Sequence, residues 1–254
     1  MSDTNASNSI LAACAAGDLD GLRSLLGEHR ESEPSSMPSL DTMAKTGALH
    51  AQIPIVSYAL GNGARLDSVL IKAVVKSGSV SLLQHLLAHH GLDINHEIGY
   101  MSSVLVYATS LNHPGSYIRF CFSQGADPVN QHSSTARPMM DTWRGIEVAI
   151  MCSTSGVVGL YLENGARVRG TRALRLAAAK GYVDVLTMLL RFEHGVDVVN
   201  EVVVDDLTTT GEEEEGVGTA LHAAPGAGHE DVVRVLLERG ADVGIGNTDR
   251  RRLN

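Results

Sequence analysis

The chain has 254 residues, of which 44% are hydrophobic but only 4% aromatic, so we expect a core of aliphatic side chains and alanine. This composition suits stacked helices with small side chains better than a β-sandwich. The net charge of −9 argues against a general nucleic-acid binder, because neutralising phosphate groups requires a basic face.

The cysteine pattern and the N-terminus together predict a cytoplasmic or nuclear protein. Cys14, Cys121 and Cys152 are an odd number of thiols, lie within helical patterns and lack the close spacing of metal ligands. The polar N-terminal residues MSDTNASNS lack the basic region of a signal peptide. No run of about 18 apolar residues occurs, so we expect neither a membrane span nor a membrane partner.

Short apolar helix patterns separated by glycine recur along the chain. The N-terminal segment SILAACAAGDLDGLRSLL has one such pattern before Gly17 and another after it. The next segment, DTMAKTGALHAQIPIVSYALGNGARL, has the weakest pattern, since it keeps only the closing Leu60 and the turn Gly63-Ala64. In chain order we predict seven helix pairs, near residues 7–27, 40–61, 67–90, 102–123, 144–163, 171–193 and 218–239.

The last pair has the most complete pattern, TALHAAPGAGHEDVVRVLLERGADV, from Thr219 to Val243. Thr219 can cap the first helix through its hydroxyl, and Gly228 separates this helix from a second one with a single apolar face. Gly240 then ends the second helix in the left-handed conformation. Neither helix is long enough to be stable alone in water, so the pair needs neighbours that cover its apolar side.

This stretch resembles the ankyrin repeat family, whose signature reads T-P-L-H-x-A-A-x-x-G-H, followed by an apolar helix and G-A-D-V; here Ala220 replaces the proline. The resemblance implies an all-α fold, a single ankyrin-repeat solenoid over residues 1–254 built from about seven stacked helix pairs. In this family, finger-like turns and short inner helices form a concave groove that grips a partner. The resemblance therefore implies a protein–protein interaction module that binds a partner protein and needs no cofactor.

Two connections exceed the usual repeat length and are predicted to project as enlarged fingers, at residues 125–143 and 198–217. The second lies in an acidic tract. From Asp197 to Glu215 there are eight carboxylates and no Lys or Arg, which leaves a net charge of −1 for the rest of the chain. Such charge runs are usually solvated loops. The alternative is a β-hairpin finger bent at Thr210-Gly211 that recruits a basic partner or covers part of the groove.

The first enlarged finger carries the residue types that are enriched at the centres of protein interfaces. Trp, Arg and Met bury a large area at a small cost in ordering. We therefore predict that Arg137, Met139, Met140, Trp143 and Arg144 bind a partner or ligand. The alternative for Trp143 is that it seals the base of its own loop.

One position of the inner helices carries Lys72, Glu147 and Arg175 in three pairs and His222 in the last. Neighbouring helices lie about 8–10 Å apart in such a stack, so we expect a mixed-charge ladder with a contact between Glu147 and Arg175. An ion pair there either stabilises adjacent repeats or orients a polar ligand. Tyr100 and His96 complete the predicted binding site.

The competing function is a small-molecule binder or an enzyme of the biosynthetic tailoring type. Its pocket would lie between the 125–143 finger and the inner helices. No recognisable set of nucleophile, base and oxyanion donors is present, so we do not expect an enzyme, although the irregular repeats keep this alternative open. The histidines lack repeated close spacing, so we predict no metal site and expect His222 and His229 to bond the backbone.

The last helix pair has the apolar residues of an interior repeat, Val232, Val233, Val235, Leu236 and Leu237. Repeat arrays normally finish with a polar cap. Either the following residues, IGNTDRRRLN, cover this face or another molecule does. For the second case, our hypothesis is an end-to-end homodimer through the C-terminal repeat.

Overall fold

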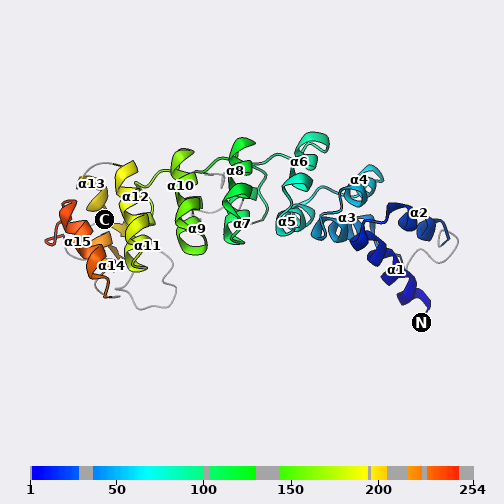
Figure 1. The fold of residues 1–254 in the computed structure, drawn as a ribbon, viewed down its shortest axis with the longest axis horizontal. Helices are drawn as coiled ribbons and strands as arrows, with labels where there is room; N and C mark the ends of the chain where they lie inside the picture. The colour runs from blue at the N-terminus through cyan, green and yellow to red at the C-terminus, as the bar shows by residue number, and fades with distance from the viewer. Residues whose placement is uncertain are drawn as a thin grey trace, which may run out of the picture. The chain divides into compact units, whose positions relative to one another are not determined.

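The structure, a computed structural model, describes residues 2–28, 37–99, 103–129, 144–193, 196–204, 217–224 and 228–245. Short helices joined by tight turns follow one another along the chain (Figure 1). The chain divides into two compact units, Met1–Leu111 with Ser123–Ala126, and Asn112–Phe122 with Asp127–Asn254. Each unit is described by itself, and the single domain over residues 1–254 stays a prediction.

The first unit is built from successive helix pairs. In the row of first helices, α3 packs between α1 and α5, and α5 packs against α7. Its core includes a buried cluster of Ile10, Cys14, Leu22, Met43 and Ile55. The helices are α1 Ser2–Ala16, α2 Leu19–Glu28, α3 Leu40–Leu49, α4 Ile53–Gly61, α5 Ser68–Lys76, α6 Val80–His89 and α7 Val104–Ser110.

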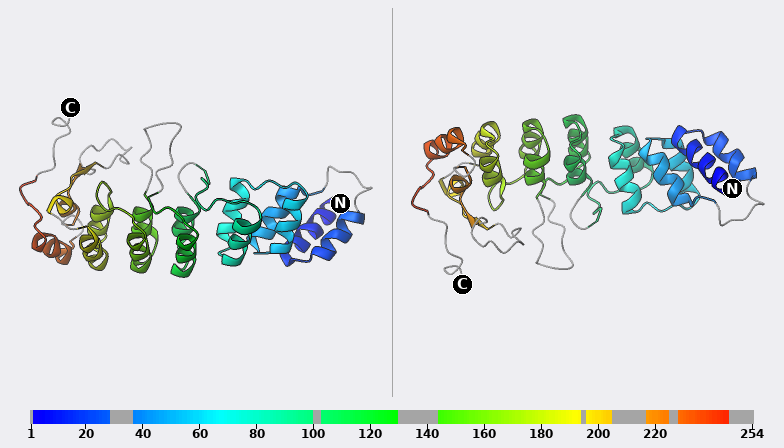
Figure 2. Two further views of the ribbon diagram at one scale, coloured as in Figure 1. Left: turned by 90° about the horizontal axis from the view of Figure 1, so that it is seen from above. Right: turned by 90° about the horizontal axis from the view of Figure 1, so that it is seen from below.

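The second unit has two rows of helices. In one row α11 packs between α9 and α14, and in the other α12 packs between α10 and α15 (Figures 1 and 2). Small buried side chains such as Ala173, Ala177 and Ala178 allow α11 to lie close to its neighbours. The elements are α8 Gly115–Ser123, α9 Gly145–Cys152, α10 Ser155–Glu163, α11 Ala173–Ala179, α12 Val183–Phe192, α13 Val196–Val199, β1 Val203–Val204, β2 Val217–Gly218, α14 Ala220–Ala223 and α15 Glu230–Glu238.

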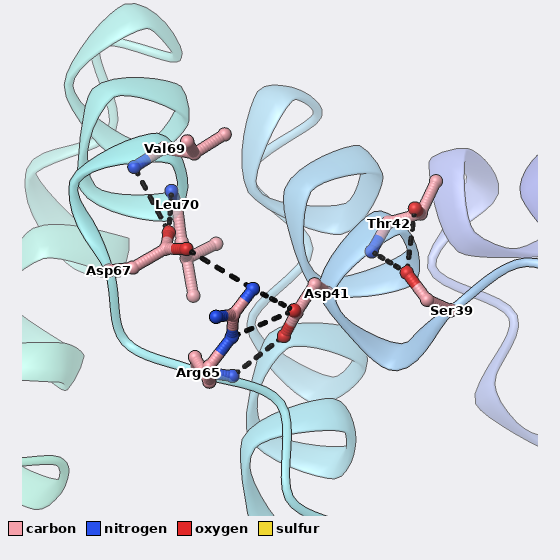
Figure 3. A network of polar contacts seen from close by, with 7 residues as sticks. All are labelled: Ser39, Asp41, Thr42, Arg65, Asp67, Val69 and Leu70. Atoms are coloured by element: carbon pink, nitrogen blue, oxygen red, sulfur yellow. Dashed lines mark hydrogen bonds and ion pairs between the residues drawn. The ribbon is translucent and has the colours of Figure 1, made fainter.

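Local sequence explains where these helices begin and end. The Oγ of Ser39 accepts the N–H of Thr42 at 3.2 Å ahead of α3, and the Oδ1 of Asp67 accepts the N–H of Leu70 at 3.0 Å ahead of α5 (Figure 3). At the ends of α4 and α10, Gly63 and Gly165 take φ values of +103° and +93°. Glycine adopts this conformation without a steric penalty, so the chain leaves the helix at these two points.

Two side chains in the turns tie a helix pair to the one before it, and a histidine caps its own helix. The Nε2 of Gln52, which precedes α4, donates to the carbonyl oxygen of Ala15 at 3.0 Å. The Nε2 of His229, which precedes α15, lies 3.2 Å from the carbonyl oxygen of Ala179. The N–H of Thr219 donates to the Nδ1 of His222 at 3.3 Å. The expectation that His222 and His229 bond the backbone is therefore confirmed.

Apart from one strand pair, the regular structure in the described ranges is helical, which confirms the all-α class. β1 and β2 pair antiparallel, with Val203 opposite Gly218 and Val204 opposite Val217. They flank residues 205–216, and the bend expected at Thr210-Gly211 lies outside the described residues. None of the described helices combines the length and the apolar character that a membrane-spanning helix requires.

Candidate functional site

The connection between α10 and α11, residues 164–172, is a finger whose backbone is held by two carboxylates. Glu193 accepts the N–H groups of Val168, at 2.8 Å, and of Arg169. Glu201 accepts the N–H of Gly170 with both oxygens, at 2.9 and 3.0 Å. Hydrogen bonds to charged acceptors are stronger than those between neutral groups, so the finger keeps one backbone shape.

The start of α9 lies beside this finger because of a close helix contact. Gly145 is the first residue of α9, and a Cβ there would be 2.5 Å from the Cε1 of Tyr161 on α10. The absence of a side chain therefore lets the two helices approach. Arg144, which precedes Gly145, is brought against the finger, where a Cβ on Gly170 would be 3.7 Å from its Nη1.

A buried ion pair joins α9 to the end of the finger. Glu147 Oε2 accepts Arg172 Nη2 at 2.9 Å, and the two side chains are 3% and 4% exposed. Glu147 Oε1 accepts the N–H of Arg172 at 2.8 Å, and its Oε2 also accepts the N–H of Arg144 at 3.2 Å. Both oxygens of this carboxylate are thus used to fix the site.

Between the start of α9 and the finger lies a pocket of about 260 Å³, which we call the finger pocket. Its basic lining consists of Arg144, Arg167 and Arg169. Gly170 and the apolar residues Pro128, Val129, Ile146 and Ala166 complete the lining. Two of its lining residues, Val129 and Arg144, are the last described residue before segment 130–143 and the first after it.

The three arginines of the finger pocket differ in their partners. Arg169 Nη2 lies 3.8 Å from Asp197 Oδ2, and both side chains are exposed. Within the described ranges, the guanidinium groups of Arg144 and Arg167 make no ion pair. A guanidinium presents several donors in a plane that matches a carboxylate or phosphate, so the pocket is suited to an anionic group.

The residues predicted to form the site belong to different units or lie outside the described ranges. Lys72 and His96 belong to the first unit, where Lys72 lies beside Gly99 and His96 is exposed. Arg144, Glu147 and Arg175 belong to the second unit. Residues outside the described ranges are Arg137, Met139, Met140, Trp143 and Tyr100.

Glu147 contacts a different arginine from the one expected. Its ion-pair partner is Arg172, whereas Arg175 lines a second small cavity with Leu174, Val198 and Glu201. Glu147 and His222 are both the third residue of their helices, where a side chain reaches back to the cap instead of across to the next helix. The mixed-charge ladder is therefore wrong at Glu147, and a carboxylate this enclosed cannot face a ligand.

Three arginines of the site, Arg167, Arg169 and Arg172, were not singled out from the sequence. A signal was present, because four arginines fall between residues 167 and 175 of a chain with a net charge of −9. The bulky side chains at residues 137–143 are the more conspicuous interface signal in the sequence. In the described part of the chain, no group of three or more His, Cys, Asp or Glu side chains is placed to hold a metal ion.

Comparisons with known proteins identify the repeat. Residues 146–247 match the family model described as ankyrin repeats, in three copies. The crystal structure of the human ASB11 ankyrin repeat domain matches with a TM-score of 0.62 and 18% identity, covering 92% of this chain and 98% of that chain. No curated protein matches the chain. The predicted ankyrin-repeat fold is thus confirmed: residues 146–247 match ankyrin repeats by sequence, and the chain as a whole resembles an ankyrin repeat domain in fold.

Proposed function

We propose that the chain is a protein-binding module whose second unit contacts a partner protein through its fingers and its first helices. Ankyrin repeats are in general protein–protein interaction modules, and stacked repeats offer extended surfaces for this purpose. The cytoplasmic or nuclear location and the role of the enlarged fingers stay predictions.

The observation that carries the proposal is the finger pocket on a backbone that is already fixed. Glu193 and Glu201 hold the finger through backbone N–H groups, so little conformational freedom remains to be lost on binding. Arginine is enriched at protein interfaces because it combines a long apolar stem with a charged head. Arg167 and Arg169 are exposed on this finger.

Site-specific crosslinking tests the proposal. The photoreactive residue p-benzoylphenylalanine replaces Arg169 on the finger or, as a matched control, Arg191, which is exposed on α12. Each variant is irradiated in an extract of the source organism, and crosslinked proteins are identified by mass spectrometry. We expect a defined protein adduct from position 169 that position 191 does not give. Identical adducts from both positions, or none from position 169, would contradict the proposal.

A further inference from the structure

The finger arginine Arg167 has an internal counterpart in the first unit. Arg65 and Arg167 both follow a Gly-Ala dipeptide that ends a second helix. The geometry is the same in both, because the N–H of Ala64 donates to Ala59 and the N–H of Ala166 to Tyr161, each at 2.9 Å. Both arginines thus leave equivalent helix ends.

In the first unit this arginine binds a carboxylate. Arg65 donates its Nε and Nη2 to the Oδ2 of Asp41, at 3.1 and 2.9 Å, and its backbone N–H to the Oδ1 at 2.8 Å (Figure 3). Asp41 is the second residue of α3, counted after the cap Ser39. The finger arginine therefore recognises a carboxylate that stands at the start of the preceding first helix.

In the second unit the same position carries an apolar side chain. The first helix of the pair that precedes the finger there is α9, which begins after Arg144, so its second residue is Ile146. Ile146 and Arg167 both line the finger pocket of about 260 Å³. Arg167 thus faces an open pocket where its counterpart faces a carboxylate.

Three carboxylates beside the finger are committed elsewhere. Glu147 is bonded to Arg172, and Glu193 and Glu201 accept N–H groups of the finger backbone. Arg144 adds a second guanidinium to the pocket. Two cationic groups beside an apolar wall attract an anion whose carbon stem can pack against that wall.

We propose that the finger pocket binds a carboxylate side chain from an acidic segment of the partner protein, in the arrangement that Asp41 adopts against Arg65. This inference rests on the proposed function and names the chemistry of the partner's contact segment. The methylene groups of a glutamate would lie on Ile146, and its carboxylate would reach Arg144 and Arg167.

Peptide binding by the full chain tests this inference. The probes are a fluorescein-labelled hexaglutamate peptide and a hexaglutamine peptide with the same label, followed by fluorescence anisotropy at low ionic strength. We expect hexaglutamate to bind at least tenfold more tightly than hexaglutamine, and Arg167→Gln or Arg144→Gln to weaken hexaglutamate binding at least tenfold, since a charge-assisted contact contributes about that factor.

Two control variants remove the same charge elsewhere. Arg65→Gln removes the equivalent finger arginine, which Asp41 already engages, and Arg234→Gln removes an exposed arginine of α15 in the second unit. We expect both to bind hexaglutamate within about twofold of the unmodified chain, because neither arginine lines the pocket and exposed charges are screened. Equal binding of the two peptides, or equal losses in the pocket and control variants, would overturn the inference.

The same variants separate this inference from the proposed function. If the finger crosslinks to a partner protein but Arg167→Gln leaves that adduct and hexaglutamate binding unchanged, the protein-binding function stands and the carboxylate pocket is wrong. If hexaglutamate binding depends on Arg167 but no partner crosslinks at position 169, the pocket chemistry stands and the proposed function is wrong.

Discussion

Glu147 shows how much one side chain can hold in place in this protein. It is 2% exposed and bonds the backbone of Arg144, the backbone of Arg172 and the guanidinium of Arg172. We predict that Glu147→Gln lowers the free energy of unfolding by about 3–5 kcal/mol, because removing one member of a buried ion pair leaves the other charge uncompensated. Urea denaturation followed by circular dichroism measures the change.

An exposed ion pair of the same unit provides the control for this prediction. Asp197→Asn removes the partner of Arg169, whose side chain is 61% exposed while that of Asp197 is 84% exposed. Exposed pairs contribute about 0–1 kcal/mol, so this variant should unfold at nearly the same urea concentration as the unmodified chain. Equal effects of the two substitutions would mean that Glu147 is not enclosed as described.

The thiols should differ in reactivity because they differ in burial. Cys152 is exposed, whereas Cys14 and Cys121 are buried. Burial raises the pKa of Cys121 to about 12 and also raises the pKa of Cys14, and the thiolate is the reactive form. We predict that iodoacetamide at pH 8 alkylates Cys152 in the native chain and the other two thiols only after unfolding. Rapid labelling of Cys121 in the native chain, seen by peptide mass spectrometry, would contradict this.

The same pKa shift has a consequence for stability. The unfolded chain releases the proton of Cys121 near the ordinary pKa of 9.0, while the folded chain keeps it up to about pH 12. The folded state therefore binds more protons between these values, and its stability falls as the pH rises through this window. Cys121→Ala should remove this contribution to the loss of stability at alkaline pH.

Residue partners were harder to predict from the sequence than residue types. Glu147 and Arg175 occupy equivalent helix positions, so pattern alone placed them opposite each other. The length of the finger determines which arginine contacts Glu147 on α9. That arginine is Arg172, which immediately precedes α11. The conformation of the finger cannot be inferred from the periodicity of the helices. The sequence could therefore suggest a Glu–Arg pair but not which arginine belongs to it.

Among the elements, the turn glycines differ in how closely the next helix pair packs against them. Gly181 has φ +70°, and a Cβ there would lie 2.5 Å from the Nδ1 of His229. Gly165 has φ +93° and open space around its Cα. Gly165→Ala should cost about 1–2 kcal/mol for the left-handed backbone alone, whereas Gly181→Ala should cost more because His229 must also move. Urea unfolding of both variants measures the difference.

A double variant tests whether the contact between Gly181 and His229 causes the larger destabilisation by Gly181→Ala. Combining Gly181→Ala with His229→Ala removes the obstructing ring, so the cost of Gly181→Ala measured in the His229→Ala background should fall to that of Gly165→Ala. If the cost in that background remains the same, the turn of α14–α15 does not pack on Gly181 as the structure has it.

The strand pair predicts that the acidic tract can be shortened. Val204 and Val217 are paired, so the residues that flank 205–216 are already side by side. Replacing these residues with Asn-Gly should close a two-residue hairpin, because this dipeptide favours the required turn. We expect an unchanged helical circular dichroism spectrum and a free energy of unfolding within about 1 kcal/mol of the original. A chain that fails to fold would show that the tract is structural.

The second helix pair illustrates what a repeat signature misses. Its sequence keeps little of the pattern, yet α3 and α4 form, and a Cβ on Gly47 would be 2.8 Å from the Cγ2 of Ile55. A glycine here replaces the usual small residue and allows the two helices to approach closely. The helical fold could therefore be predicted from apolar spacing, whereas this contact depends on a single residue outside the signature.

For the whole molecule, the net charge is negative, whereas the charge around the finger is positive. The chain carries −9 overall, and eight carboxylates lie between residues 197 and 215, but four arginines lie between residues 167 and 175. The overall charge argues against a nucleic-acid function, but it does not describe the surface that a partner meets. The finger pocket needed coordinates, because it joins residues from two connections and the start of α9.

The C-terminal helix pair carries exposed apolar side chains at the predicted contact between two molecules. Val232 and Leu236 of α15 are fully buried, but Leu237 is 45% exposed and Val243 is 77% exposed. Burying such side chains stabilises association by about 25 cal/mol per Å² of apolar area, so we predict an end-to-end dimer that forms through this face at high concentration. Leu237→Glu should abolish the dimer in sedimentation velocity experiments, because the contact would bury an unpaired charge. Leu49→Glu, at a leucine of α3 that is 42% exposed, should leave it unchanged. A chain that stays monomeric at the highest soluble concentration, or a dimer that survives Leu237→Glu, would exclude this interface.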